Sequence, residues 1–203
     1  MMGKREESRE ELRRRLLDAA ERRIVEGGLG GLRARDLTAE AGVALGSLYS
    51  AFESLDLLIL QVNARTLARL DERLRHAAPE DLPPAERMVA LARGYVRFAL
   101  AERPLWAALF DHRLPEGVPV PEDHREAHVR IMRLIAGPLA RLRPDLGPEG
   151  LSLRARTLFA AVHGVVHLSL TGQFVGTPRE ALEDEVVALV QSLVRGIPAS
   201  ASG

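Results

Sequence analysis

The chain has 203 residues, of which 46% are hydrophobic and only 4% are aromatic. Basic and acidic side chains balance, and the formal net charge of zero gives no overall sign of nucleic-acid binding. Cysteine is absent, which excludes disulfides, thiolate metal sites and thiol nucleophiles.

The composition favours helices and does not indicate a membrane protein. Leu, Ala, Arg and Glu are strong helix formers, and no β-branched run alternates like a strand, so we expect an all-α fold. No apolar run reaches the roughly 18 residues of a membrane span. The charged beginning, MMGKREESREELRRR, lacks the apolar core of a signal peptide. We therefore expect a cytoplasmic protein with no membrane partner.

The first predicted helix covers residues 7–26. Its apolar residues recur at three- and four-residue steps and form one stripe: Leu12, Leu16, Ala19, Ala20 and Ile24. Glu11 stands four residues before Arg15, a spacing that favours an ion pair along the helix. Gly27 and Gly28 are expected to end the helix in the left-handed conformation.

Two short helices are predicted next, over residues 33–41 and 45–51. Gly42 lies in the turn AGVA between them, where a positive φ is expected. The apolar positions fit a small core: Leu32, Leu37, Val43, Leu48 and Phe52. Two short helices joined by a tight turn after an amphipathic helix are typical of helix-turn-helix DNA-binding proteins.

A longer helix is predicted over residues 55–76, with Ser54 as its N-cap. Prolines at positions 79, 83 and 84 break the chain after it. We predict a helix-turn-helix domain of residues 1–54 and a helical domain of residues 55–203, linked by helix 55–76. Further helices are expected over residues 84–101, 104–111, 121–142, 150–174 and 178–195.

Residues 32–59, LRARDLTAEAGVALGSLYSAFESLDLLI, resemble the DNA-binding module of the TetR family of transcriptional repressors. The family pattern runs roughly as (I/L)-A-x-x-A-G-V, then S-K-G-(T/S)-L-Y-x-H-F, then x-S-K-E-x-L. The match has no gaps and includes Leu37, Ala41, Gly42, Val43, Gly46, Ser47, Leu48, Tyr49, Phe52 and Ser54. The stretch AAVHGVVHLSL, residues 160–170, also resembles a helix of one family branch.

This resemblance implies a transcriptional regulator that binds a double-stranded DNA operator as a homodimer. One recognition helix per subunit would enter successive major grooves of a near-palindromic site. The resemblance also implies a larger C-terminal domain that binds a small-molecule effector and changes the spacing of the two DNA-binding heads. A repressor released from its operator by an effector is the expected function, with no cofactor and no enzymatic activity.

The chain also departs from the family pattern at positions that mostly contact phosphates. Ala44 and Leu45 replace Ser-Lys, Ala51 replaces His, and Leu55 replaces Lys. Each lost phosphate contact lowers affinity and flattens its dependence on salt. The alternative function is therefore a small-molecule-binding helical protein whose DNA-binding head has weakened or lost affinity.

Several residues remain as candidates for DNA binding. Arginine clamps phosphate through two donors, so Arg33 and Arg35 are predicted phosphate contacts, the alternative being solvated charge. Gly46 leaves room for a close backbone approach, and hydroxyl donors complete the predicted surface: Ser47, Tyr49 and Ser50. Residues 45–51 contain no Arg, Lys, Asn or Gln. Specificity is thus expected from serine contacts, thymine methyl groups and DNA shape.

The predicted effector pocket uses aromatic and histidine side chains that gather beyond the head: Phe98, Trp106, Phe110, His163 and His167. The alternative for these side chains is core packing. His124 and His128, like His163 and His167, stand four residues apart, which is a metal-ligand spacing. Neither pair has the glutamate of a zincin motif after its first histidine, so no metal and no catalytic residue are predicted.

Strongly apolar residues on the last two predicted helices suggest where two subunits meet. This surface consists of Leu158, Ala161, Val162, Val165, Leu168 and Ser169 on one helix and Val186, Val187, Leu189, Val190 and Val194 on the other. A two-fold four-helix interface would bury it.

Overall fold

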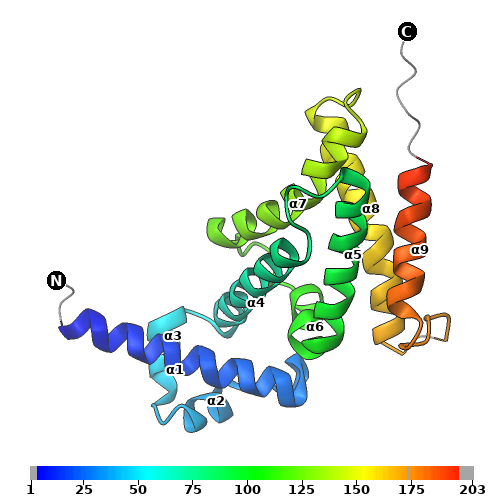
Figure 1. The fold of residues 1–203 in the computed structure, drawn as a ribbon. Helices are drawn as coiled ribbons and strands as arrows, with labels where there is room; N and C mark the ends of the chain where they lie inside the picture. Colours follow the sequence, from blue (N-terminus) through cyan, green and yellow to red (C-terminus); the bar gives the residue numbers. More distant parts are fainter. Residues whose placement is uncertain (1–3, 173, 197–203) are drawn as a thin grey trace. The chain divides into compact units, whose positions relative to one another are not determined.

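The computed structural model describes residues 4–172 and 174–196, which form α-helices and one short 3₁₀ helix without any strand (Figure 1). This confirms the predicted all-α fold. The elements are α1 (Lys4–Gly27), η1 (Leu29–Gly31), α2 (Ala34–Glu40), α3 (Leu45–Phe52), α4 (Leu55–Ala77), α5 (Pro84–Ala101), α6 (Arg103–Asp111), α7 (Glu122–Leu142), α8 (Pro148–Leu170) and α9 (Leu182–Arg195).

The predicted helices all form, and the largest differences lie between α8 and α9. The helix predicted to reach residue 174 ends at Leu170, because Gly172 adopts a φ of 74° that an α-helix does not accommodate. The helix predicted from residue 178 begins at Leu182. The amide of Leu182 donates a hydrogen bond to the carbonyl of Arg179, and this bond closes an i→i+3 turn rather than an α-helical turn.

The chain divides into two compact units. The first comprises the described residues up to Leu67 together with Pro104–Arg125, and the second comprises Ala68–Arg103 and the described residues from Glu126 onward. Helices α4 and α7 each contribute to both units. The predicted domain boundary after residue 54 lies within the first unit and stays a prediction about the folding domains.

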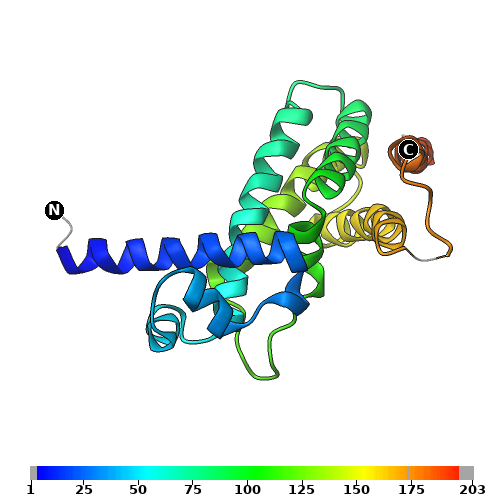
Figure 2. The same cartoon turned by 90° about the horizontal axis from the view of Figure 1, so that it is seen from below.

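The core of the first unit forms where α1 crosses the helix-turn-helix. Helices α2 and α3 pack against each other and against α1 (Figure 2). The stripe predicted on α1 is buried there, with Leu16, Ala20 and Ile24 fully excluded from solvent. They meet Leu37 of α2 and Leu48 of α3, which are equally buried. The spacing of apolar residues thus determines which side of each helix faces the core.

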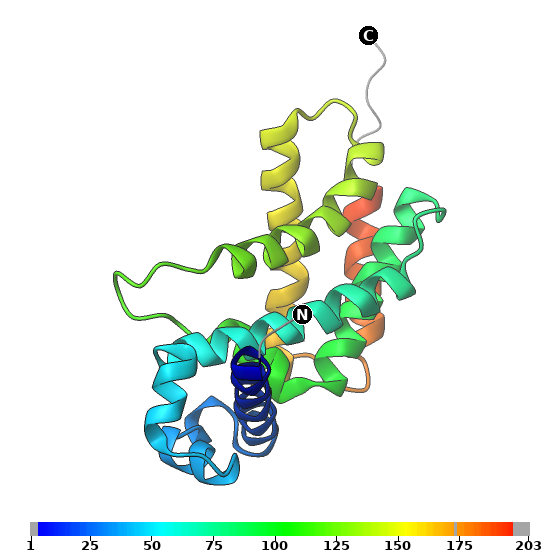
Figure 3. The same ribbon diagram turned by 90° about the vertical axis from the view of Figure 1, so that its left-hand side faces the viewer.

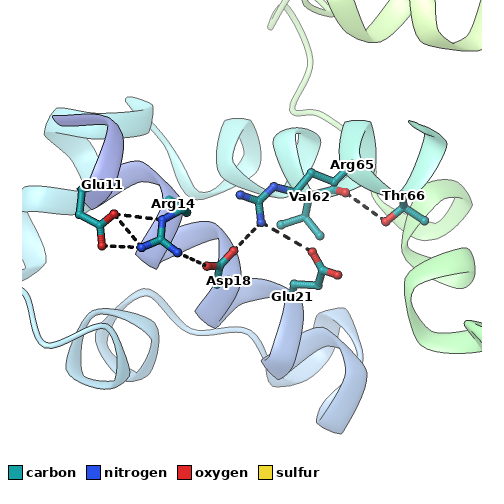
Figure 4. A network of polar contacts seen from close by, with 7 residues as sticks. All are labelled: Glu11, Arg14, Asp18, Glu21, Val62, Arg65 and Thr66. Atoms are coloured by element: carbon teal, nitrogen blue, oxygen red, sulfur yellow. Dashed lines mark hydrogen bonds and ion pairs between the residues drawn. The ribbon is translucent and has the colours of Figure 1, made fainter. Parts of the chain in front are cut away.

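A network of charged side chains joins α1 to the middle of α4 (Figure 4). The Arg65 guanidinium lies 2.7 Å from an Asp18 carboxylate oxygen and 3.8 Å from one of Glu21. Arg14 pairs with Glu11 at 2.7 Å and approaches Asp18 at 3.8 Å. The Glu11 carboxylate therefore binds Arg14 three residues away, whereas the expected partner Arg15 donates to the backbone carbonyl of Ala41.

Helices α5, α8 and α9 pack together in the second unit. The helices α8 and α9 run antiparallel beside each other (Figure 3). Arg97 of α5 donates two hydrogen bonds to Glu183 of α9, at 2.9 and 2.8 Å, and Arg93 lies 3.3 Å from the same carboxylate. These bonds lower the pKa of Glu183 below its ordinary value. None of the described helices has the length and hydropathy needed to cross a membrane.

Candidate DNA-binding surface and ligand cavity

The turn between α2 and α3 has the geometry that its sequence predicts. Gly42 has a φ of 64°, which confirms the expected positive value. The amide of Val43 donates to the Thr38 carbonyl at 2.9 Å, and the amide of Gly42 donates to Ala39 at 3.1 Å. These bonds close the turn tightly and direct the chain into α3 at Leu45.

Helix α3 has one buried and one exposed side. Leu48, Ala51 and Phe52 are buried in the core of the first unit. Leu45 and Tyr49, one turn apart, are 38% and 47% exposed. Large apolar and aromatic side chains thus lie on the outer side of the helix, where they are available to a partner.

Two arginines of α1 bind the C-terminal ends of the helix-turn-helix. Arg15 donates to the carbonyl of Ala41, just after α2, and Arg13 donates to the carbonyl of Ala51 in the last turn of α3. The Arg13 guanidinium also lies 4.2 Å from the centre of the Phe52 ring. Carbonyls at helix C-termini lack intrahelical donors and carry partial negative charge, so cations stabilise them.

This role of α1 was not predicted from the sequence. The only signal for it was the arginine triplet at positions 13–15, between the stripe residues Leu12, which is partly buried, and Leu16, which is fully buried.

Three of the six predicted DNA-binding residues, Arg33, Arg35 and Tyr49, border one hollow of the first unit. Arg33 is the N-cap of α2 and Arg35 lies in its first turn, and both are exposed. Neither guanidinium makes a hydrogen bond or an ion pair with a described residue. The two arginines border a shallow hollow together with Ala34, Asp36, Leu45 and Tyr49. The structure therefore brings Arg33, Arg35 and Tyr49 to the same surface.

The smaller predicted residues occupy α3 itself. Gly46 is exposed, and a Cβ atom added there would meet open space. Ser50 is also exposed, and its hydroxyl donates to the Gly46 carbonyl at 3.0 Å. Ser47 is half-buried.

Two of the four departures from the family pattern serve the core in this chain. Ala51 is only 5% exposed, and Leu55 is half-buried against the core of the first unit. Ala44 and Leu45 instead lie at the exposed start of α3. The outer side of α3 therefore has no cationic side chain. Arg33 and Arg35, at the N-terminal end of α2, supply the positive charge beside it.

Acidic groups near this surface are partly neutralised by α1. Glu40 accepts from Arg22 at 2.9 Å and from Arg23 at 2.7 Å, and Asp36 lies 3.9 Å from Arg23. These pairs reduce the repulsion that the α2 carboxylates would exert on an approaching polyanion.

The second unit contains an apolar cavity of about 50 Å³. Side chains of α4, α5, α7, α8 and α9 line it. They are Leu74, Met88, Leu91, Ala92, Tyr95, Ile131, Ile135, Leu158, Phe159, Val162, Val190, Leu193 and Val194. Among the lining residues, Tyr95 is the one with a hydroxyl group, and none has a charged side chain.

An aromatic cluster joins α5 and α8 at this cavity. The Tyr95 hydroxyl and His163 Nδ1 lie 2.8 Å apart in a hydrogen bond. Phe159 meets Tyr95 edge-on at 5.7 Å between ring centroids and stacks on His163 at 5.5 Å. The rings of His163 and His167 are 5.5 Å apart. One face of α8 therefore holds the tyrosine hydroxyl in a fixed aromatic environment.

The structure places the five predicted effector residues in different surroundings. Phe98 is buried in α5, while Trp106 and Phe110 pack together in α6 of the first unit, 5.4 Å apart. His163 and His167 neighbour each other on α8. The cavity lining itself contains none of these five, and their effector role stays a prediction.

Tyr95 and Phe159 line the cavity but were not predicted. The available signal was the four-residue spacing that places Phe159 on the same face of α8 as His163 and His167. Within the described residues, no three His, Cys, Asp or Glu side chains gather in a manner that could hold a metal ion.

Two family models match the chain. One, described as bacterial regulatory proteins of the tetR family, matches residues 16–62, which include the whole of α2, the turn and α3. The other, described as the tetracyclin repressor-like C-terminal domain, matches residues 88–193, which is more than half of the chain. The DNA-binding surface and the cavity thus lie largely within separately matched regions.

Individual proteins show the same similarity. The chain is 30% identical over 82 residues to the HTH-type transcriptional regulator PksA of Bacillus subtilis (strain 168), and this alignment spans only 40% of that relative and 40% of this chain. A solved Rhodococcus sp. RHA1 protein of unknown function is 31% identical, with a TM-score of 0.72, covering 91% of this chain and 94% of that one. The TetR family regulator PfmR of Thermus thermophilus, at 16% identity and a TM-score of 0.60 over 90% of this chain and 98% of its own, shares the fold.

Proposed function

Because the chain belongs to the TetR family of DNA-binding transcriptional regulators, we propose that it binds operator DNA as a homodimer and represses transcription until a small-molecule effector releases it. Effector and operator would favour different separations of the two heads, so that each weakens the binding of the other. The cavity of the second unit is the proposed effector site.

The observation that carries the DNA-binding proposal is the exposed side of α3 beside two exposed arginines. Leu45 and Tyr49 lie on that side, and Arg33 and Arg35 border the same hollow. In the proposed complex α3 enters the major groove, and the arginines bind phosphates on its edge. Gly46 permits close approach of the backbone, while Ser47 and Ser50 contribute hydroxyls.

A salt series tests this proposal with DNA from the region upstream of the protein's own gene. Each arginine bound to phosphate contributes to the slope of log affinity against log salt, so Arg33→Ala and Arg35→Ala are each expected to reduce the slope by about one per subunit. Arg75→Ala is the matched control, because Arg75 is an exposed arginine of α4 that pairs with Asp71. Absence of saturable binding by the wild-type protein would refute the proposal.

The second candidate function is a ligand-binding protein that has lost DNA affinity. The exposed Leu45, in place of the family's lysine, favours it, because α3 then has no cation for a phosphate. This candidate predicts ligand binding in the cavity together with equal, negligible DNA affinity for the wild type and both arginine variants. Measurable affinity that falls in both variants and not in Arg75→Ala decides for the regulator.

A homodimer also follows from the proposed function. The structure shows that Leu158, Val162 and Val186 of the predicted interface are buried within the subunit, as are Val187 and Val190. The remaining apolar candidates are Ala161, Val165 and Leu168 of α8 and Leu189 and Val194 of α9, and of these Leu168 is 40% exposed. The proposed interface is therefore narrower than the apolar pattern of the two helices predicted.

A further inference from the structure

The lining of the cavity in the second unit is apolar. It consists of aliphatic side chains, the thioether of Met88 and the rings of Tyr95 and Phe159. The Tyr95 hydroxyl is engaged in its hydrogen bond with His163 Nδ1 at 2.8 Å, so it is not available to a molecule in the cavity. The lining side chains project from five helices, which use their backbone N–H and C=O groups in their own hydrogen bonds along most of their length. The cavity therefore offers a ligand apolar contacts alone.

A polar molecule loses free energy when it enters such a space. A hydroxyl or amide group leaves its hydrogen bonds to water behind, and the lining does not replace them. An ionised carboxylate or ammonium group loses its hydration without meeting an opposite charge, which costs more. Water is subject to the same penalty, because a buried water molecule needs roughly two to four polar partners. The lining thus disfavours every ligand that has to bury a polar group in the cavity.

A hydrocarbon gains free energy on the same transfer. Its removal from water is favourable in proportion to its apolar surface. Side chains that border a space without contact atoms lose dispersion contacts on that side, so a molecule that fills the space adds them. Leu91, Ile131 and Val190 of the lining belong to α5, α7 and α9, so one bound molecule contacts several helices at once.

The size of the cavity limits the ligand to a few heavy atoms. About 50 Å³ is well below the roughly 150 Å³ of an engineered cavity that holds benzene. Met88 is unbranched and flexible, so it can adjust to the shape of a compact molecule. Each larger ligand has to displace further packed side chains, which costs packing contacts.

Resting on the effector-responsive function proposed above, we propose that this cavity binds a compact hydrocarbon and excludes molecules that would bury a hydrogen-bonding or charged group in it. Within this class, size and shape select the ligand instead of polar contacts. Short alkanes and alkenes belong to the class, whereas alcohols, amines and carboxylates of the same size do not.

Methyl NMR of the full-length protein tests the ligand class directly. Of the four methionines, Met88 lines the cavity, and Met132 is a methionine of α7 outside the lining, so the two ¹³C-methyl signals provide a probe and an internal reference. Propane and ethanol are a matched pair, because a hydroxyl group replaces one methyl group, and ethylammonium adds a charge. We expect propane to shift the Met88 signal saturably, and ethanol and ethylammonium to bind at least about tenfold more weakly at pH 7.

Two variants change the cavity in opposite directions. Ala92→Val adds methyl groups at a lining position and fills the space, so propane affinity should fall at least about fivefold. Leu91→Ala removes most of a lining side chain and should admit benzene but not phenol, because the enlarged cavity still has no polar partner. Val129→Ala is the matched control, since Val129 is an exposed residue of α7 outside the lining. The Met132 signal shows that each variant remains folded.

Three results would overturn the assignment. The first is a Met88 signal that does not respond to propane. The second is an affinity for ethanol or ethylammonium that lies closer to that of propane than about tenfold. The third is an equal propane affinity in Ala92→Val, Val129→Ala and the wild type, which would place the bound propane outside the cavity.

Failure of this assignment is distinguishable from failure of the proposed function. The NMR titration contains no DNA, and the operator titration contains no ligand. Selective propane binding without operator binding supports the cavity assignment and contradicts the regulator. Operator binding with a Met88 signal that ignores propane retains the regulator and overturns the assigned ligand class.

Discussion

Leu45 occupies the first position of α3, where the family pattern has a lysine, and its side chain is exposed beside Tyr49. In the proposed complex an apolar side chain at this position recognises base edges through the methyl group of thymine. Replacing individual thymines of the operator by uracil removes that methyl group and retains base pairing. We expect one replacement per half-site to weaken binding about two- to fourfold, as measured by fluorescence anisotropy.

The variant Leu45→Ala provides the control for this thymine contact. Its affinity for the unmodified operator should fall by a similar factor, and the uracil replacement should then have little further effect because the two changes remove the same contact. If no thymine in the half-site responds to replacement in the wild-type protein, Leu45 does not read a methyl group.

The family's lysine at the same position tests why binding is expected to be weak. Leu45→Lys adds one cation to the exposed side of α3, which has none in the wild type. We expect higher affinity at low salt and a salt slope steeper by about one per subunit, since each new phosphate contact releases a counterion. Leu45→Gln is the uncharged control. An unchanged slope for the lysine variant would place residue 45 away from phosphate.

At the scale of elements, α1 positions the recognition helix through Arg13. Its guanidinium donates to the Ala51 carbonyl and lies over the Phe52 ring. Arg13→Ala removes both contacts, so we expect the free energy of unfolding to fall by about 1–3 kcal/mol in urea denaturation. Arg13→Lys should recover part of it, because lysine retains the charge but not the planar donors.

The neighbouring arginine of α1 is the control for Arg13→Ala. Arg14 is exposed and pairs with Glu11 in solvent, so Arg14→Ala should leave the denaturation midpoint nearly unchanged. Equal decreases in the free energy of unfolding for the two alanine variants would show that the contacts of Arg13 with α3 do not stabilise the fold. A selective loss in Arg13→Ala should also lower operator affinity, because α3 loses its fixed C-terminal end.

A second pair of elements, α4 and the end of α6, is joined by a titratable contact. The His112 side chain is only 4% exposed, and its Nε2 lies 3.1 Å from an Asp56 carboxylate oxygen. Burial lowers the pKa of His112 below 6.5, although Asp56 acts in the opposite direction. The histidine is therefore neutral in the folded protein near pH 7.

This lowered pKa predicts a loss of stability in acid. Below pH 6.5 the unfolded chain binds a proton at His112 more readily than the folded protein, so the contribution of His112 to stability decreases as pH falls from 6.5 toward its folded pKa. His112→Gln should reduce the difference in unfolding free energy between pH 7 and pH 5.5, measured in urea. His76→Gln on exposed α4 surface is the control; equal pH profiles of wild type and His112→Gln would contradict the prediction.

Periodicity and turn chemistry predicted the helices because both act locally. The stripe on α1 and the positive φ of Gly42 follow from residues within a few positions of each other. The region between α8 and α9 was less predictable. The sequence after Leu170 is compatible with a longer helix, which the left-handed conformation of Gly172 excludes. The turn hydrogen bonds before Leu182 have no distinct sequence pattern.

The site contacts were harder to predict because they join distant parts of the sequence. Tyr95 and His163 are 68 positions apart, and Arg13 is 38 positions from Ala51. Neither spacing produces a local pattern. The residues of the DNA-binding surface were accessible to sequence analysis because Arg33, Arg35 and Tyr49 belong to one continuous motif.

At the scale of the whole molecule, the proposed homodimer depends on the outer side of α8. Leu168 is exposed there, and Ala160 and Gly164 precede it at four-residue intervals on the same side. Small residues allow another helix to approach closely, while an apolar leucine gains from burial. The natural partner for such a self-complementary surface is the same helix of a second subunit.

Placing a charge on this surface should therefore separate the subunits. We expect Leu168→Glu to shift the protein from dimer to monomer in analytical ultracentrifugation, because two glutamates would face each other across the two-fold axis. Val129→Glu is the control, since Val129 is an exposed apolar residue of α7. The monomer should bind a full operator only as tightly as a half-site. In the dimer, binding of one DNA-binding head keeps the second head close to the DNA, and the monomer lacks that second head. A wild-type monomer, or a dimer retained in Leu168→Glu, would refute an interface at Leu168.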